Sequence, residues 1–593
     1  MTVTDAIAVD RSPTTFIIRA AIGLLQGLAL FALLRAAETK SWPATEAMLY
    51  APLVTVCVFV PLVAIVGFHN LRPQALALWT AIVTALCAAL AAEDIFRDPG
   101  TGARHDPQAL LWAALAAGLF IGHSLIVAGS TDRKYLAAYA TDFAVSWKLA
   151  LQGALAGAFV GAFWLLLWIG AELFRLIRIE FLADLIKHDW FWIPATTFVG
   201  ACALHITDAR AGFVEGTRTL ALALLSWLLP VMTLFCIAFV LALPFTGLEP
   251  LWSTRRATAI LLVAAAALVV LINAAYQDGR YDSPAALRYA SRAAALVLVP
   301  LVGLAAYGLS LRVTQYGWTT ERVNACACIV IAACYAIGYA ATALGWRARL
   351  AGIEATNIAT SLAVLAVLLA LFTPIADPAR IAVADQMRRL ADGRVAPEKF
   401  DYEFLRFRSG RYGLEALAQI AAQEPVAGAA QRANRMLYAR TPAEAHNRSE
   451  PLSAQSRAAN ITLLHAAGQI LPERFLAQDW ARFYAVPPCL VTATSKCEAL
   501  MMDLDGDGTP EILLFSLVNA STAAFKAEAD GSWALLGSIA HCAGVHDTLR
   551  SGPVVLAEPR FKEIEVGRDR LRIVPSCEQN LNVRAVRRSE GTR

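Results

Sequence analysis

Long apolar runs constrain this chain more than any other feature of its sequence. Residues 1–376 contain eleven of them, each about as long as the roughly 20 residues that a helix needs to cross a bilayer. The expected spans are residues 15–36, 47–68, 75–93, 109–130, 149–173, 191–207, 219–243, 257–275, 293–313, 323–345 and 356–375. Their length and their Leu-, Ala- and Val-rich composition favour helices over barrel strands, because lipid requires every backbone group to be hydrogen-bonded. The sequence therefore predicts a polytopic α-helical membrane protein surrounded by a lipid bilayer.

Charged residues divide the chain into two regions. Residues 1–376 hold 45 of them, whereas the shorter remainder, residues 377–593, holds 53. We therefore expect the transmembrane domain to be followed by a water-soluble α+β domain. The predicted organisation is an N-terminal cytoplasmic tail (1–14), a transmembrane domain (15–376), a helical extramembrane segment (377–480) and a small β-rich domain (481–593).

The soluble region changes its pattern part-way along. Apolar residues recur at helical spacing from about Asp377 to Trp480. Arg406, Arg408 and Arg411 in this part could bind an anion, although a solvated or salt-bridged face is favoured. From about Cys489 onward, short alternating runs predict a small antiparallel β domain. These runs are EILLFSLV, SWALLGSI, GPVVLA, KEIEV and DRLRIVP.

An acidic loop, DLDGDGTPE, precedes the first of these predicted strands. Alternating aspartates followed by a glycine gather hard oxygen ligands around a tight turn, as a structural Ca²⁺ site requires. The candidate ligands are Asp503, Asp505, Asp507, the backbone carbonyl of Thr509, and Glu511. Position 12 holds Leu514 instead of the bidentate glutamate of an EF-hand, and the loop resembles the shorter variant of integrin-type repeats. The alternative is a surface acidic turn that binds no metal.

Cysteine placement bears on the compartment of the soluble region. Seven of the eleven cysteines lie in the apolar runs, and the other four are Cys489, Cys497, Cys542 and Cys577. We expect Cys489 to pair with Cys497, and Cys542 with Cys577; the alternative is four reduced thiols in the cytosol. Disulfides and a Ca²⁺ loop together favour a periplasmic C-terminal domain. The positive-inside count agrees only narrowly, with 13 Lys and Arg on the cytoplasmic side against 11 outside.

A family resemblance appears at Tyr316–Arg322, where the chain reads Tyr-Gly-x-Thr-x-x-Arg. This segment, and the stretch RRLADGRVAPEKFDYEFLRFRSGRYGLEAL, resemble a family of bacterial polytopic inner-membrane proteins that carries only a domain-of-unknown-function label. The resemblance implies an inner-membrane location and supplies no activity. From the residues themselves, Thr319 is expected to cap a helix and Arg322 to lie near the membrane interface.

The motifs of the chain leave two functional hypotheses. The chain has no P-loop, Gly-x-Ser-x-Gly or His-Glu-x-x-His, so an enzymatic role is not favoured, and no nucleic-acid partner is expected. His123 is the best candidate for an intramembrane polar site, and no opposite charges are expected to pair at matching depth. The first hypothesis is an envelope scaffold or sensor with a calcium-stabilised periplasmic domain that binds an envelope protein. The second is a secondary transporter of a small solute.

Overall fold

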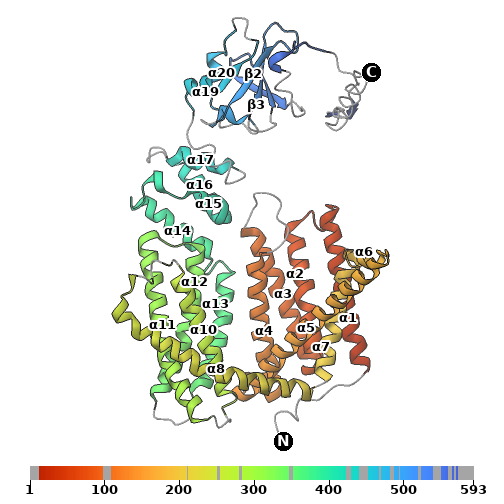
Figure 1. Cartoon of the computed structure of the whole chain (residues 1–593), viewed down its shortest axis with the longest axis vertical. Helices are drawn as coiled ribbons and strands as arrows, with labels where there is room; N and C mark the ends of the chain where they lie inside the picture. Colours follow the sequence, from red (N-terminus) through yellow and green to blue (C-terminus); the bar gives the residue numbers. More distant parts are fainter. Residues whose placement is uncertain are drawn as a thin grey trace. The chain divides into compact units, whose positions relative to one another are not determined.

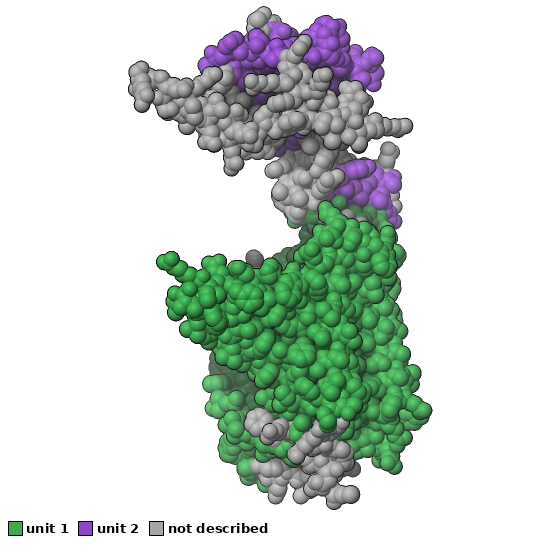
Figure 2. All heavy atoms as spheres, turned by 90° about the vertical axis from the view of Figure 1, so that its right-hand side faces the viewer, with its two compact units in different colours: residues 1–416 green, residues 417–593 purple. Residues whose placement is uncertain are grey.

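The protein forms two compact units, residues 1–416 and residues 417–593 (Figure 2). The computed structural model describes residues 13–97, 108–209, 211–249, 251, 254, 256–279, 284–345, 352–422, 429–439, 452–465, 469–480, 486–492, 495–517, 522–538, 549–557, 564–566 and 569–571. Helices fill the described part of the first unit, and the second unit contains a small sheet with short helices. This confirms the predicted fold class of a polytopic helical protein followed by an α+β region.

Ten helices of the described chain are long and apolar enough to cross a membrane. They are α1 (Pro13–Glu38), α2 (Ala47–Asn70), α3 (Pro73–Arg97), α4 (Ala109–Asp132), α5 (Tyr139–Leu176), α8 (Ala211–Thr246), α10 (Ala257–Tyr276), α11 (Ala285–Tyr316), α12 (Thr320–Leu344) and α13 (Gly352–Leu371). The remaining predicted run, residues 191–207, forms α7 (Asp189–Ala209), which is preceded by the short α6 (Phe181–Leu185). Because α7 contains Asp189, His205 and Asp208, it is more polar than a typical spanning helix.

Close backbone contact joins α1 to α7. Gly23 and Gly27, four residues apart, lie on the face of α1 that meets α7. A Cβ atom on Gly23 would lie 2.5 Å from the Cβ of Ala201, and one on Gly27 only 2.4 Å from the Cα of Pro194. Small residues at this spacing are how membrane helices pack closely when lipid supplies no hydrophobic driving force between them.

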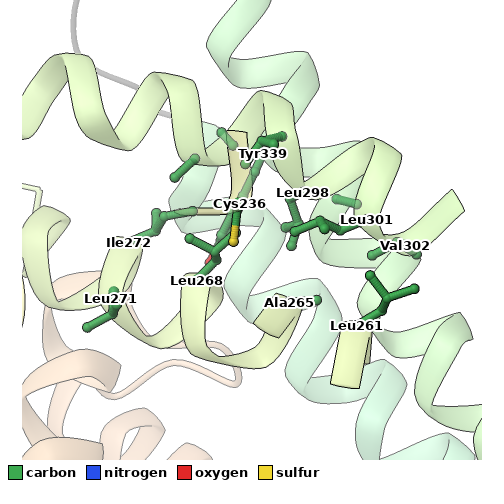
Figure 3. Close-up of a cluster of buried hydrophobic side chains, with 14 of the residues drawn as sticks. Cys236, Leu261, Ala265, Leu268, Leu271, Ile272, Leu298, Leu301, Val302 and Tyr339 are labelled. Atoms are coloured by element: carbon green, nitrogen blue, oxygen red, sulfur yellow. The ribbon is translucent and has the colours of Figure 1, made fainter. Parts of the chain in front are cut away.

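The largest apolar core of the first unit lies among α8, α10, α11 and α12 (Figure 3). Cys236, Leu268, Leu298 and Tyr339 contribute one side chain each from these four helices. By contrast, large apolar residues elsewhere on the helices are exposed, as at Phe235, which is 64% exposed. An apolar outer surface of this kind suits lipid contact.

A helical cap follows α13 within the same unit. It comprises α14 (Pro378–Ala391), the 3₁₀ turn η2 (Pro397–Lys399), α15 (Tyr402–Arg408) and the start of α16 (Gly410–Ala422). Asp377 caps α14 by accepting hydrogen bonds from the amides of Ala379 at 2.8 Å and Arg380 at 3.2 Å. Figure 1 shows α14 at the end of the helical unit opposite the start of α1.

The second unit is built around a five-stranded sheet in the order β1-β2-β3-β4-β5. Its helices and strands are α17 (Ala429–Tyr438), α19 (Ala454–Asn460), β1 (Ile461–Leu463), α20 (Glu473–Ala477), η4 (Pro488–Leu490), β2 (Cys497–Met502), β3 (Glu511–Ser516), β4 (Thr522–Ala527), β5 (Trp533–Ser538), β6 (Ile564–Val566) and β7 (Asp569–Leu571). Phe475, Trp480, Phe525 and Trp533 pack together as its aromatic core, with ring centroids of Trp480 and Phe525 4.9 Å apart.

The sheet differs from the predicted antiparallel domain: β2 and β4 lie outside the predicted runs, and two further differences concern one pairing and one predicted strand. β1 pairs parallel with β2, so a strand from the segment predicted as helical contributes to the sheet. The predicted strand GPVVLA, residues 552–557, is irregular instead. Both errors have one cause: three to six residues carry too little periodic signal to decide pairing, which depends on distant partners.

Candidate functional sites

The acidic loop folds around the carboxylate of Asp503. The amide of Gly506 donates to its Oδ1 at 2.7 Å, and the amide of Gly508 donates to its Oδ2 at 2.9 Å. Both glycines have positive φ angles, 78° and 85°, which other residues rarely adopt. The amide of Leu504 donates to Oε2 of Glu511 at 2.7 Å, so the loop is closed where β3 begins.

Three of the predicted ligands come together in this loop. Oxygen atoms of Asp503, Asp505 and Glu511 lie within 4.8 Å of one another, close enough to hold one metal ion. Glu511 is only 1% exposed, whereas the two aspartates are accessible. Three ionised carboxylates this close repel one another, and a positive charge nearby would offset that repulsion. The donor set, all hard oxygen, could hold a hard metal ion.

Lys526 on β4 supplies one positive charge that the sequence reasoning missed. Its ammonium donates to Asp505 and, at 2.8 Å, to Asp507, and it lies 4.0 Å from Glu511. The hydrogen bond from Lys526 lowers the pKa of Asp507, and the two aspartates raise the pKa of Lys526. Four carboxylates against one ammonium leave the loop with three negative charges. The chain therefore compensates only part of the repulsion.

Cys489 and Cys497 lie in the same unit and form the first of the two predicted pairs. Their sulfur atoms are at disulfide distance, 1.90 Å, with the Cα atoms 5.8 Å apart. The pair joins η4 to the first residue of β2. Cys542 and Cys577 lie outside the described residues, so their pairing stays a prediction.

His123, the predicted intramembrane polar site, is buried in α4 and is 5% exposed. The indole Nε1 of Trp79 on α3 donates to its Nδ1 at 3.1 Å, so its proton is placed on Nε2. Among the described residues, no hydrogen-bond partner contacts that Nε2. One ring nitrogen thus joins two helices, and a role in transport stays a prediction.

An ionised cluster lies between α1, α5 and α7, and it corrects the expectation that no opposite charges pair. Asp208 accepts from Arg19 at 3.0 Å, from Lys148 at 3.0 Å and from Gln152 at 3.1 Å. Arg19 is 2% exposed. The three charges come from different helices. Arg19 and Lys148 lie near the ends of the predicted spans 15–36 and 149–173, so nothing in the sequence indicated that they share a partner.

A second polar network crosses four helices near one end of the first unit. The side-chain amide of Asn273 on α10 donates to the hydroxyl of Tyr339 on α12 at 2.8 Å. The side-chain amide of Asn357 on α13 donates to Oδ1 of Asn273 at 2.5 Å. Tyr139 of α5 donates to the same oxygen at 3.2 Å. The sequence did not indicate this network, because an isolated Tyr or Asn in an apolar run does not reveal its partner.

The Tyr316–Arg322 segment is a tight connection between α11 and α12 that α14 holds in place. Gly317 has φ of 79°, and Arg322 donates to its carbonyl while lying 5.6 Å from the ring of Tyr316. Asp385 of α14 accepts from the amide of Trp318 at 2.8 Å. Thr319 caps α12 by accepting from the amide of Arg322 at 3.4 Å. The Thr319 contact supports the expected capping role, and the place of Arg322 near the membrane interface stays a prediction.

Comparison with known proteins bears on the first unit. The family model described as Domain of unknown function (DUF4153) matches residues 49–420, more than half of the 593-residue chain. The chain belongs to the DUF4153 family. This confirms the resemblance to a family whose function is unassigned. No curated protein and no solved structure matches the chain. The DUF4153 match contains the Tyr316–Arg322 segment and ends before the acidic loop.

Proposed function

We propose that this DUF4153 protein is an envelope scaffold or sensor of the bacterial inner membrane, whose C-terminal domain lies in the periplasm and is stabilised by Ca²⁺. The convergence of Asp503, Asp505 and Glu511 within 4.8 Å carries this proposal. The closeness of Cys489 and Cys497 supports it independently, since disulfides persist in oxidising compartments. An envelope protein would bind the domain that the ion stabilises.

Ca²⁺ would occupy the loop by adding positive charge that Lys526 supplies only in part. Asp503, Asp505, Glu511 and the carbonyl of Thr509 would hold the ion, with Asp507 completing the set proposed from sequence. Because Lys526 contacts Asp505, the ammonium and the metal ion compete for that carboxylate. Such competition suits the weak affinities of extracellular Ca²⁺ modules, about 10⁻⁴–10⁻³ M.

Hydrogen exchange of the full-length protein tests the calcium site. At about 10 mM Ca²⁺ we expect the amides of Gly506 and Gly508 to exchange roughly 10- to 100-fold more slowly than with a chelator, because binding suppresses loop opening by that factor. Mass spectrometry of peptides covering the loop measures the rates.

The Asp505→Ala variant should lose this calcium protection. Asp530→Asn is the matched control, because Asp530 is an exposed turn aspartate of the same unit that accepts from Ser532 and lies outside the loop. Equal exchange rates with Ca²⁺ and with chelator in the unmodified protein would reduce the loop to an acidic turn closed by Lys526.

A secondary transporter is the alternative, and the Arg19–Asp208–Lys148 cluster favours it. Buried ionised groups between membrane helices are costly, and they often line solute or ion pathways. Solute uptake into proteoliposomes that is lost in His123→Ala would support transport. Slower amide exchange of the loop in Ca²⁺, without any solute uptake into proteoliposomes, would favour the scaffold or sensor.

A further inference from the structure

A polar cavity of about 390 Å³ lies in the first unit at the ends of several membrane helices. It is lined by the last residue of α3, the beginnings of α4, α12 and α14, and the α15–α16 corner. Its charged lining residues are Arg97, Glu321, Arg406 and Arg408. Asp377 pairs with Arg97 from behind the lining, so three guanidinium groups meet two carboxylates and one positive charge is in excess. An excess of arginine in a cavity is suited to an anionic group, because the planar guanidinium binds phosphate oxygens in pairs.

The arginines of this cavity differ in how firmly they are held. Arg97 is fixed by the buried Asp377, with Nε 2.7 Å from Oδ2. Within the part of the chain that the structure describes, the ion pair of Arg408 is a long contact of 3.6 Å with Glu321, and both side chains are more than 60% exposed (66% and 63%). An exposed ion pair of that length contributes little stability. A phosphate group could therefore take the guanidinium of Arg408 away from Glu321 at small cost.

An apolar groove of about 160 Å³ adjoins the polar cavity and lies between α3, α4 and α13. Phe372, just past the end of α13, lines both. Away from Phe372 the groove is lined by residues such as Leu90, Leu115 and Leu368. Gly118 of α4 leaves room in it, since an added Cβ would meet Leu368 at an ordinary 3.6 Å.

We propose that these two cavities form one binding site for a membrane amphiphile that has a phosphate-bearing headgroup and an acyl chain. The headgroup lies among Arg97, Arg406 and Arg408, and the chain lies in the groove beside Gly118. The adjacency at Phe372 carries the proposal, because neither a small anion nor a plain hydrocarbon would use both parts. The site is made entirely by the first unit and does not depend on the calcium loop.

Photo-crosslinking of the full-length protein in detergent tests the proposal. The probe is a phosphatidylglycerol with a diazirine in one acyl chain, and mass spectrometry maps the labelled peptides. We expect labelling of α4 and α13 around the groove. Arg406→Gln with Arg408→Gln should reduce this labelling roughly tenfold, which is the usual effect of losing a charged hydrogen bond to phosphate. Arg388→Gln should leave it unchanged, because Arg388 is an equally exposed arginine of α14 outside the cavity.

Groove-filling variants test the acyl chain. Gly118→Leu should abolish labelling, whereas Gly118→Ala, which the groove accommodates, should retain it and report that the fold is intact. A diacylglycerol with the same photoreactive chain should label roughly tenfold less than phosphatidylglycerol. Two results together would make the cavity a small-anion site and overturn the proposal. Inorganic phosphate would bind equally well to the Gly118→Leu variant, and the lipid probe would label no defined peptides of α4 or α13. So would equal labelling in the Arg406/Arg408 and Arg388 variants.

Discussion

Replacing Asp208 with asparagine should destabilise the membrane unit by about 3–5 kcal/mol, the usual cost of removing one partner from a buried ion pair. The carboxylate pairs with both Arg19 and Lys148 at 3.0 Å each, and Arg19 is 2% exposed. Among the described residues, Nε of Arg19 has no hydrogen-bond partner, so asparagine would leave two cations in a poorly solvated site. Unfolding of the purified protein in mixed micelles measures the loss.

Asp184→Asn provides the control for that experiment. Asp184 also pairs with a lysine, Lys187, at 3.3 Å, but both side chains are more than half exposed (57% and 64%). Its loss should cost less than about 1 kcal/mol. Adding Lys148→Met to Asp208→Asn should recover part of the stability, because one of the two cations that lost their counter-ion is then removed. Equal losses for the Asp208 and Asp184 variants would show that the cluster is not buried as described.

Replacing Asp377 with alanine should have the second large effect, at about 3 kcal/mol or more. One carboxylate oxygen of Asp377 caps α14, and the other lies 2.7 Å from Nε of Arg97 at the end of α3. Asp377 is fully buried, so alanine would remove the cap and leave Arg97 without its counter-ion. Thermal unfolding of the full-length protein, read from the membrane unit, measures the loss.

Asp401→Ala separates capping from ion pairing. Asp401 caps α15 by accepting from the amide of Phe404 at 2.8 Å, but it is exposed. Its replacement should therefore cost only about 1 kcal/mol, the usual value of an N-cap. A loss for Asp377→Ala no larger than that for Asp401→Ala would contradict a stabilising role for the Arg97 pair.

The membrane fold could be predicted from sequence because its signal is local. A helix in lipid satisfies its own backbone, so a run of about 20 apolar residues is enough to indicate it. The same argument explains the weakest case, α7, where Asp208 and His205 interrupt the run because they contact other helices. The acidic loop was also predictable, since its ligands lie within nine residues of one another.

Features that depend on distant partners could not be predicted. Arg19 and Asp208 are 189 positions apart, and the sequence around either residue does not indicate that the other is its partner. Lys526 lies on a strand whose pairing with β3 brings it over the acidic loop, and the strand was not recognised from its six residues. The polar cavity likewise joins the end of α3 to the α15–α16 corner, which are separate in sequence. In each case the sequence shows the charged residues, but it does not show which of them lie next to one another in the fold.

The position of the C-terminal domain relative to the membrane tests the central proposal most directly. A protease-cleavable tag fused after Arg593 should be removed from intact spheroplasts by added protease, while a cytoplasmic marker protein stays intact. Such cleavage would place the acidic loop and the Cys489–Cys497 pair in the calcium-rich, oxidising periplasm, as proposed. A tag that is cleaved only after lysis would put both in a reducing, calcium-poor compartment and would contradict the account of this domain.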